Sequence, residues 1–411
     1  MKKHLITNNQ HYSTLKLPAA PRLVISGYYG FDNIGDEAVL LSMVAALRDI
    51  CPEARITVLS NKPRETAEHY DVQAVNRWQL TRVYRALAGT DLLISGGGSL
   101  LQDVTGLKSL LYYLGVVWLA LKLGKPVAFY SQGIGPVTSR MGRCLMRRIA
   151  GRVNLITVRD AQSARDLHEM GITGPPVRVT ADPVLGLSGE TINPQPGGEL
   201  LFKAGIKISH NSKAGLHLDP EDMMLDKYAL KQEHRPVAGI SLREWPGFEK
   251  KSQQVIAGLG DELCRQGWQV VFLPFHYPAD LAVCRQVAGL MKNPGIILEQ
   301  KVNAVEMASV ISHLNLLIAM RLHALILAAV ASVPLAGISY DPKINRFLEQ
   351  LGLAPVGEAA HLDYPACLAA VTNILADPDG FRTNLRQAIQ PLRRQAQETA
   401  ALTLNLIRND S

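Results

Sequence analysis

Arg321 and His323 have the clearest chemical potential in the sequence, because they stand between two apolar runs. Residues 314–319 have the pattern of a buried strand, and residues 324–331 that of an equally apolar helix. A buried arginine is costly without a partner. Either an internal carboxylate pairs with Arg321 and His323 is a core residue, or an anionic substrate is the missing partner. We favour the substrate, since polar side chains at a strand end are typical of a site.

Other basic side chains follow strand-like runs and are candidate anion contacts. They are Arg159, Arg243 and Lys343. Guanidinium groups bind carboxylate and phosphate through paired hydrogen bonds, and lysine adds a compact charge. The ordinary alternative for Lys343 is a place on the surface of the following helix.

Glycine-rich turns follow three other strand-like runs, 22–26, 91–95 and 126–131. Gly97 and Gly98 belong to one of these turns, where small residues allow either close ligand approach or dense packing. Another turn, residues 27–36, lacks the dinucleotide spacing G-x-G-x-x-G. Its Tyr29 and Phe31 predict either an aromatic wall for a sugar ring or packing within a cleft.

Three acidic side chains lie near these turns. Asp36 and Glu37 begin the helix after the first turn, where Asn33 or Asp36 is the expected cap. Asp103 follows the second turn and either binds a sugar hydroxyl or pairs on the surface. No spacing of carboxylates and histidines fits a metal site.

The elements that position these residues alternate between strand and helix. The expected strands are 22–26, 56–59, 91–95, 126–131, 155–158, 237–242, 269–273, 295–298, 314–319 and 335–339, and the expected helices include 37–48 and 380–408. Such alternation predicts βαβ units, and therefore an α/β protein with two Rossmann-like domains whose parallel sheets face a cleft.

The domain boundaries follow from where this pattern fails. We expect a flexible N-terminal arm over 1–21, an α/β domain over 22–187, a linker or insertion over 188–234, a second α/β domain over 235–380, and a C-terminal helix over 381–411. A chain of 411 residues with 47% apolar residues can fill two such cores.

The composition of the chain indicates what kind of partner it binds and in which cellular compartment it lies. The net charge of +7 suits an anionic partner, and five scattered cysteines fit a reducing cytoplasm. The five arginines between 140 and 152 are interpreted as a solvated helix face, with contact to lipid headgroups as the alternative. No aromatic and basic residues interleave as in nucleic-acid binders. No run has the pattern of a signal peptide or a membrane span.

Several segments, in order, resemble the polysaccharide pyruvyl transferase family, and in particular its CsaB-type members. They are Gly27-Tyr28-Tyr29-Gly30-Phe31, Gly35-Asp36-Glu37, Gly96-Gly97-Gly98-Ser99, Gly133-Ile134-Gly135-Pro136, Val158-Arg159-Asp160, Asp182-Pro183, Arg321-Leu322-His323 and Tyr340-Asp341-Pro342-Lys343. The matching segments cover most of residues 22–380, and residues 188–234 have no counterpart.

The resemblance implies a fold like the GT-B glycosyltransferases, phosphoenolpyruvate as donor, and a pyruvyl ketal on a sugar as product. The implied acceptor is an N-acetylmannosamine unit on a lipid-diphosphate-linked cell-wall precursor, whose polymer anchors surface-layer proteins. Arg159, Arg321, His323 and Lys343 match functional positions, and Tyr29 and Phe31 match acceptor positions. No cofactor is implied, and the location is cytoplasmic, with the inner membrane face left open.

Two rival functions are also considered. A GT-B glycosyltransferase using a nucleotide sugar would need a ribose-binding acidic pattern, which the sequence does not show clearly. A non-catalytic module that binds anionic sugars would keep the arginines but tolerate loss of His323.

Overall fold

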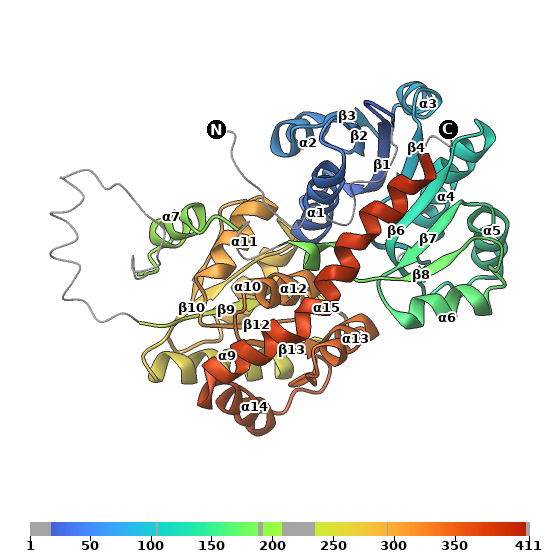
Figure 1. Cartoon of the computed structure of the whole chain (residues 1–411). Helices are drawn as coiled ribbons and strands as arrows, with labels where there is room; N and C mark the ends of the chain where they lie inside the picture. Colours follow the sequence, from blue (N-terminus) through green and yellow to red (C-terminus); the bar gives the residue numbers. More distant parts are fainter. Residues whose placement is uncertain (1–17, 104–105, 188–191, 208–234, 294, 408–411) are drawn as a thin grey trace, which may run out of the picture. The chain divides into compact units, whose positions relative to one another are not determined.

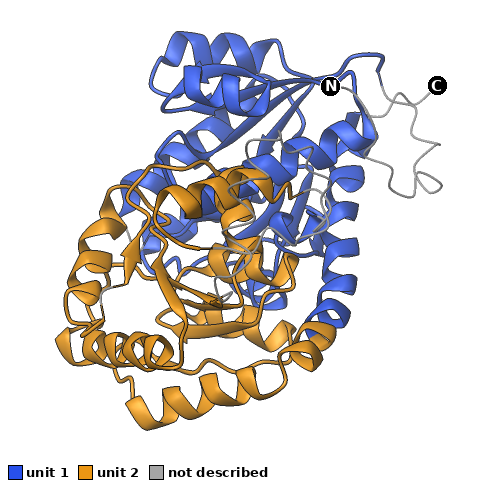
Figure 2. Cartoon of the chain, turned by 90° about the vertical axis from the view of Figure 1, so that its left-hand side faces the viewer, with its two compact units in different colours: residues 1–191, 385–411 blue, residues 192–384 orange. Residues whose placement is uncertain are grey.

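The computed structural model describes residues 18–103, 106–187, 192–207, 235–293 and 295–407. The chain divides into two compact units, coloured separately in Figure 2. Unit 1 comprises Met1–Thr191 and Leu385–Ser411, and unit 2 comprises Ile192–Asn384.

Unit 1 is built on a parallel sheet whose neighbouring strands run in the order β3-β2-β1-β4-β6-β7-β8, with β5 paired to β6. The strands are β1 (Arg22–Tyr29), β2 (Arg55–Ser60), β3 (Gln73–Asn76), β4 (Leu92–Ser95), β5 (Gly98–Leu101), β6 (Val127–Ile134), β7 (Leu155–Val158) and β8 (Val177–Val179). The strand β6 is buried along its whole length, which explains the apolar run 127–130 with which it begins.

Helices cover both faces of this sheet (Figure 1). They are α1 (Ile34–Ile50), α2 (Pro63–Tyr70), α3 (Leu80–Ala88), α4 (Leu107–Lys122), α5 (Arg140–Ala150) and α6 (Ala161–Glu169), with a 3₁₀ turn η1 (Pro183–Gly186). The strand order reverses after β1, so right-handed crossovers place α1 and α2 on one face and α3 to α6 on the other.

Unit 2 has a second parallel sheet in the order β11-β10-β9-β12-β13-β14. Its strands are β9 (Val237–Ser241), β10 (Gln269–Phe272), β11 (Ile296–Ile297), β12 (Leu316–Ala319), β13 (Leu335–Ser339) and β14 (Gly357–Glu358). Its helices are α7 (Gln195–Lys203), α9 (Lys250–Arg265), α10 (Ala279–Ala288), α11 (Ala304–Ser312), α12 (Leu322–Val330), α13 (Pro342–Gln350) and α14 (Tyr364–Ala376). The last long helix, α15 (Pro378–Leu404), begins in unit 2, ends in unit 1, and is followed by η3 (Asn405–Ile407).

The structure differs locally from the sequence expectations in three places. Helix α1 begins at Ile34, three residues earlier than expected, because the Asn33 side chain accepts a hydrogen bond from the amide of Gly35. The run after the triple glycine continues as strand β5, paired with β6, instead of entering a helix at once. Residues 192–207 of the expected linker contain α7, and residues 188–191 and 208–234 lie outside the described residues, as does most of the expected N-terminal arm.

Candidate functional site

Arg321 lies directly beyond the carboxyl end of β12, at the start of α12. Its Nε donates a hydrogen bond of 2.9 Å to Asp280 Oδ2, and its Nη2 donates to Asp280 Oδ1. Asp280 is only 1% exposed, and it also accepts hydrogen bonds from the amides of Phe275 and His276. The guanidinium is therefore held in one orientation by a buried carboxylate.

The interpretation that Arg321 has no partner within the chain is thus wrong. Asp280 belongs to α10, which follows β10, two strands away from β12 in the sheet, and its carboxylate neutralises the guanidinium at short range. A guanidinium carries five N–H donors, and the two that Asp280 uses leave the rest of the planar fork to meet an anion. Pairing with Asp280 therefore orients Arg321 without using all of its N–H donors.

His323 is the second residue of α12 and is half-buried, with its Nε2 atom inside the protein surface. The N-cap residue of α12, Arg321, makes no capping hydrogen bond with its side chain. The first amides of a helix have no partner within the helix and favour an anion nearby. The imidazole thus lies where an anionic group is electrostatically favoured.

Arg243 extends from the loop after β9, the strand next to β12. Its Nη1 donates a hydrogen bond of 2.8 Å to the Tyr340 hydroxyl, and its guanidinium lies over the rings of Trp245 and Tyr340. Its Nε is buried and meets no hydrogen-bond acceptor among the described residues. A buried donor without an acceptor is a cost that a bound anion would remove.

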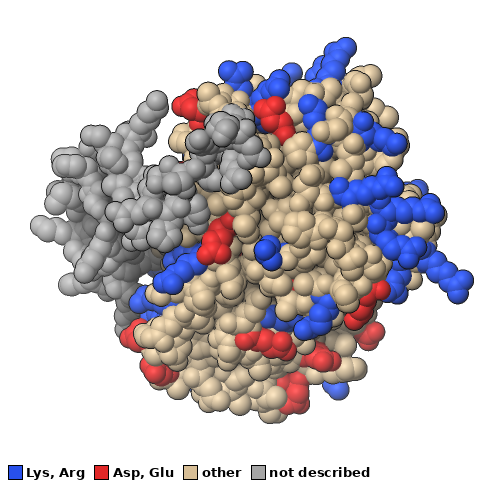
Figure 3. Space-filling view, turned by 45° about the vertical axis from the view of Figure 1, so that its right-hand side comes forward, with Lys and Arg blue, Asp and Glu red and all other residues tan. Residues whose placement is uncertain are grey.

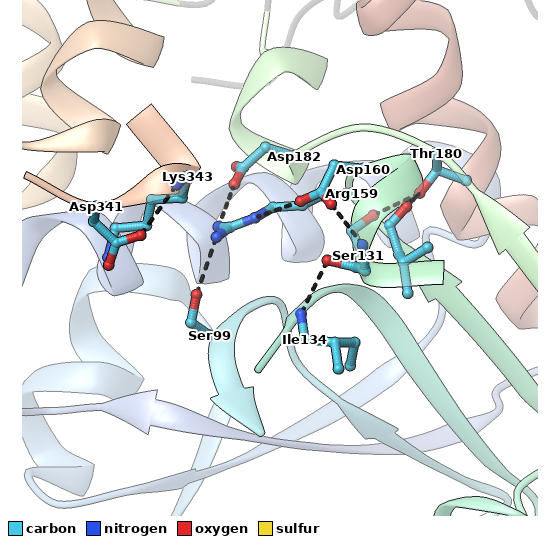
Figure 4. Close-up of polar contacts among 11 residues, drawn as sticks. Ser99, Ser131, Ile134, Arg159, Asp160, Thr180, Asp182, Asp341 and Lys343 are labelled. Atoms are coloured by element: carbon cyan, nitrogen blue, oxygen red, sulfur yellow. Dashed lines mark hydrogen bonds and ion pairs between the residues drawn. The ribbon is translucent and has the colours of Figure 1, made fainter. Parts of the chain in front are cut away.

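Lys343 extends from α13, after β13. Its Nζ lies 3.2 Å from Asp341 and 5.4 Å from the centre of the Tyr340 ring. Asp341 also caps α13 by accepting a hydrogen bond from the Lys343 amide. Figure 4 shows this pair, with the lysine side chain turned toward the carboxylate.

These side chains share one edge of the unit 2 sheet. Ala319 of β12 pairs with Ser241 of β9 and with Gly337 of β13, so β9 and β12 end level and β13 continues two residues further, to Ser339, at the same edge. Neighbouring parallel strands lie about 4.8 Å apart. The structure therefore gathers at this edge the predicted residues Arg243, Arg321, His323 and Lys343.

Arg159 occupies the equivalent position in unit 1, beyond the end of β7. It is 7% exposed, its Nη1 lies 3.3 Å from Asp182, and its Nη2 donates a hydrogen bond of 3.0 Å to Ser99 Oγ (Figure 4). A Cβ atom added at Gly133 would lie only 2.6 Å from Arg159 Nη2. The glycine at this position therefore makes room for the guanidinium.

Gly97 and Gly98 of the triple-glycine turn lie close to different neighbours. A Cβ atom at Gly97 would approach Val39 and Pro183 within 3.0 and 3.2 Å. Gly98 has a φ of +96°, and a Cβ there would lie 3.1 Å from Asp36 Oδ1. Gly97 thus follows the packing alternative, while Gly98 lets an acidic side chain approach the backbone.

Tyr29, predicted to face an acceptor, is instead part of the core. It is 0% exposed, and its hydroxyl contacts the Met43 sulfur at 3.7 Å. The half-buried aromatic pair at this turn is Tyr28 and Phe31, whose rings stack 4.1 Å apart and nearly parallel. The aromatic side chain that stacks on Phe31 at this turn is therefore Tyr28, and Tyr29 is not part of that pair.

The acidic residues predicted near the acceptor hold the backbone of unit 1. Glu37 accepts hydrogen bonds of 2.7 Å from the Gly30 amide and the Tyr70 hydroxyl, and burial raises its pKa. Asp36 accepts a hydrogen bond from the Asn33 side chain.

Asp103 likewise binds protein groups. Its carboxylate accepts hydrogen bonds from the amides of Thr138 and Ser139 and from the Thr138 hydroxyl, which lower its pKa to about 2. It therefore clamps the loop before α5, as in the surface-pairing alternative.

Two buried charged groups beside candidate site residues were not predicted from the sequence. Asp280 carries no local signal, since its partner lies 41 residues away. Arg77, 3% exposed at the end of β3, donates to the Gly27 carbonyl, and its guanidinium lies 4.1 Å from the ring centre of Tyr112 and 5.1 Å from that of Phe31. An arginine directly after a strand-like run and before Trp78 was the available signal.

Within the described part of the chain, no group of three or more His, Cys, Asp or Glu side chains is placed to hold a metal ion. The helices of that part also include none with the length and apolar character needed to cross a bilayer.

A family model described as polysaccharide pyruvyl transferase matches residues 33–342. Among solved structures, a putative UDP-N-acetylglucosamine 2-epimerase from Listeria monocytogenes is similar with a TM-score of 0.59 at 12% identity, covering 92% of this chain and 94% of that one. The Neisseria meningitidis UDP-GlcNAc 2-epimerase bound to UDP-GlcNAc has a TM-score of 0.58 at 12% identity, covering 94% of this chain and 99% of that one.

Anabaena Alr3699/HepE in complex with UDP and glucose has a TM-score of 0.54 at 12% identity, covering 94% of this chain and 96% of that one. At such low identity these likenesses show the fold alone. They confirm the predicted α/β, GT-B-like class with two parallel sheets.

Proposed function

Because the chain belongs to the polysaccharide pyruvyl transferase family, we propose that it moves the pyruvyl group of phosphoenolpyruvate onto two hydroxyls of a saccharide, forming a ketal. The observation that carries this proposal is the edge of the unit 2 sheet where β9, β12 and β13 end. Two arginines, a lysine and a histidine extend from that edge, a set suited to a small donor that carries both a carboxylate and a phosphate.

Arg321 and Arg243 are the proposed donor contacts. The carboxylate of Asp280 orients Arg321, and Arg243 has a buried Nε without an acceptor among the described residues. Lys343 adds a compact charge and is tethered by Asp341. Arg159, in unit 1, remains a proposed donor-binding residue on the strength of the family resemblance.

His323 is the proposed proton donor. Protonation of the methylene carbon of phosphoenolpyruvate makes the adjacent carbon cationic, and one sugar hydroxyl attacks it and loses its proton. The carbon–oxygen bond to phosphate then breaks, and the second hydroxyl attacks the same carbon and loses its proton, which leaves the ketal and inorganic phosphate. Histidine exchanges protons readily near neutral pH.

The proposed acceptor is an N-acetylmannosamine-type sugar on a lipid-diphosphate-linked cell-wall precursor. This choice rests on the CsaB-type resemblance, and the stacked pair Tyr28 and Phe31 supports a sugar-binding role by offering a flat aromatic face. The polymer made from such a precursor would serve in cell-wall assembly and surface-layer anchoring.

The test is to mix the purified chain with phosphoenolpyruvate and a lipid-diphosphate disaccharide ending in N-acetylmannosamine. We expect phosphate release and an acceptor heavier by one pyruvyl ketal in mass spectrometry. His323→Ala should reduce phosphate release by at least about a hundred-fold, whereas His361→Ala, at an exposed loop histidine, should leave it unchanged.

Two results would favour other functions. Release of UDP from a UDP-sugar, without ketal formation, would support a glycosyltransferase. Donor binding that persists without turnover, and that His323→Ala leaves intact, would support a sugar-binding module.

A further inference from the structure

Helix α4 presents a regular stripe of exposed residues on the surface of unit 1. Lys108, Leu111, Gly115, Trp118 and Lys122 are all exposed, at the spacing of one helix face. Trp118 is 49% exposed and Leu111 is 43% exposed. A Cβ atom added at Gly115 would meet nothing within 4 Å. The stripe is therefore apolar in its middle and basic at both ends.

The neighbouring helices extend this surface on the same face of the sheet. Helix α3 contributes Leu80, 75% exposed, and Tyr84, 49% exposed, and Trp78 just before it is 59% exposed. Helix α5 contributes Met141, which is 53% exposed. Large apolar side chains thus face solvent on three adjacent helices, α3, α4 and α5, whose outward surface we call the α3–α5 face.

The charge of this face has a single sign. The three helices carry eight arginines and lysines, all exposed, and no aspartate or glutamate. Figure 3 shows Lys and Arg gathered along the upper and right-hand edge of the view, the side where Figure 1 places these helices. They are Arg82, Arg85, Lys108, Lys122, Arg140, Arg143, Arg147 and Arg148.

We propose that the α3–α5 face docks onto the surface of an anionic phospholipid bilayer. Tryptophan and tyrosine are favoured at the level of lipid headgroups, leucine and methionine below it, and arginine and lysine against lipid phosphates. The exposed side chains of this face include each of these types. The docking concerns a surface of unit 1 and does not depend on the proposed ketal transfer, although it would bring the chain to a lipid-linked acceptor.

Charge and chemistry distinguish the bilayer from other occupants. A second copy docked through the same face would place eight cations against eight cations, which is unfavourable. A nucleic acid would satisfy the arginines but leaves Leu80, Leu111 and Met141 without an apolar partner. The arginines alone are consistent with a solvated helix face, and it is the apolar stripe of α4 beside them that argues for lipid.

Binding of the full chain to vesicles tests the proposal. We expect it to sediment with phosphatidylcholine vesicles that contain phosphatidylglycerol and much less with phosphatidylcholine alone. Raising the salt to about 1 M shortens the screening length to about 3 Å and should weaken this binding. The fluorescence of Trp118 should shift to shorter wavelength on binding, and Trp118→Phe should reduce that shift.

Paired variants locate the surface. Each exposed arginine near an anionic membrane strengthens binding about five-fold, so Arg143→Gln with Arg147→Gln should weaken it about 25-fold. Gly115→Glu, which adds a side chain into open space, should also weaken it without unfolding the helix. The matched control, Lys250→Gln with Lys251→Gln at exposed positions of α9 in unit 2, should bind as the parent does.

Three results would overturn the proposal. In the first, the chain shows no preference for anionic vesicles, and in the second, the α9 control loses as much vesicle binding as Arg143→Gln with Arg147→Gln does. In the third, the substitutions on the α3–α5 face leave vesicle binding unchanged. A fourth result would also overturn it: the parent chain does not bind vesicles but associates with itself or binds a DNA duplex, and Arg143→Gln with Arg147→Gln abolishes that association or binding. That result would assign the face to a second copy or to nucleic acid. Phosphate release from a soluble acceptor is measured in parallel and should not change, which keeps this test separate from that of the reaction.

Discussion

Replacing Asp280 with asparagine removes the carboxylate that orients Arg321 and keeps nearly the same size. Asp280 is 1% exposed and accepts four hydrogen bonds, two from backbone amides and two from the guanidinium. Breaking a buried ion pair by removing one partner costs about 3–5 kcal/mol. We expect about 3 kcal/mol for Asp280→Asn, at the lower end, because the Arg321 side chain is 13% exposed and its unpaired charge keeps some contact with water.

Urea unfolding measures this loss, and phosphate release from phosphoenolpyruvate measures its functional effect. At low urea the folded variant should show a raised KM for the donor, since Arg321 is no longer held in one orientation. Arg321→Met should lose activity more severely and at least as much stability, because it leaves the carboxylate of Asp280, 1% exposed, without its cation. Combining it with Asp280→Asn should give less than the sum of the two losses. A stability change below about 0.5 kcal/mol for Asp280→Asn would refute the reasoning about burial. Unchanged turnover in Arg321→Met would leave Arg321 as an internal partner of Asp280 alone.

Two further substitutions in unit 1 have definite expected outcomes. Gly133→Ala places a methyl group 2.6 Å from Arg159 Nη2. It should therefore lower phosphate release at least about ten-fold and lower the free energy of unfolding in urea by about 1–3 kcal/mol. The control Gly115→Ala adds a methyl group in open space and should change neither quantity. Burial raises the pKa of Glu37 above 4.5, so the folded state holds the proton of this carboxyl more tightly than the unfolded state does. The stability that Glu37 contributes is therefore lost as the pH rises from its unfolded pKa through its raised folded pKa. Glu37→Gln should therefore gain in urea midpoint relative to the parent from pH 4 to pH 8, and a constant difference would contradict this.

The positions of the strand-end residues were predictable because the local pattern determines them. The run before Arg321 is wholly apolar and the run after it is an apolar helix, and in the structure β12 and α12 have those places. Side chains that follow the strands of one parallel sheet must share an edge, which is why Arg243 and Lys343 could be grouped with Arg321 from sequence alone.

The orientation of the aromatic turn was not predictable in the same way. Strand β1 is buried on both faces, so alternation along it does not reveal which of Tyr28 and Tyr29 faces the core. The backbone then turns through positive φ at Gly30 and Asp32, which brings Phe31 onto Tyr28. Such a turn depends on contacts with the loop after β2, including the Asn61 side chain that donates to the Gly30 carbonyl.

The pairing of Arg321 with Asp280 changes what the proposed donor site requires. An arginine without a partner would lie beside His323 as an uncompensated positive charge. Asp280 compensates the guanidinium before any donor arrives, and Asp341 does the same for Lys343. The site would then bind a doubly acidic donor less through excess charge than through donors already oriented, and such orientation lowers the entropic cost of binding. This predicts that salt should affect the KM for phosphoenolpyruvate only modestly, while Arg321→Lys, which keeps the charge and loses the planar fork, should affect it strongly.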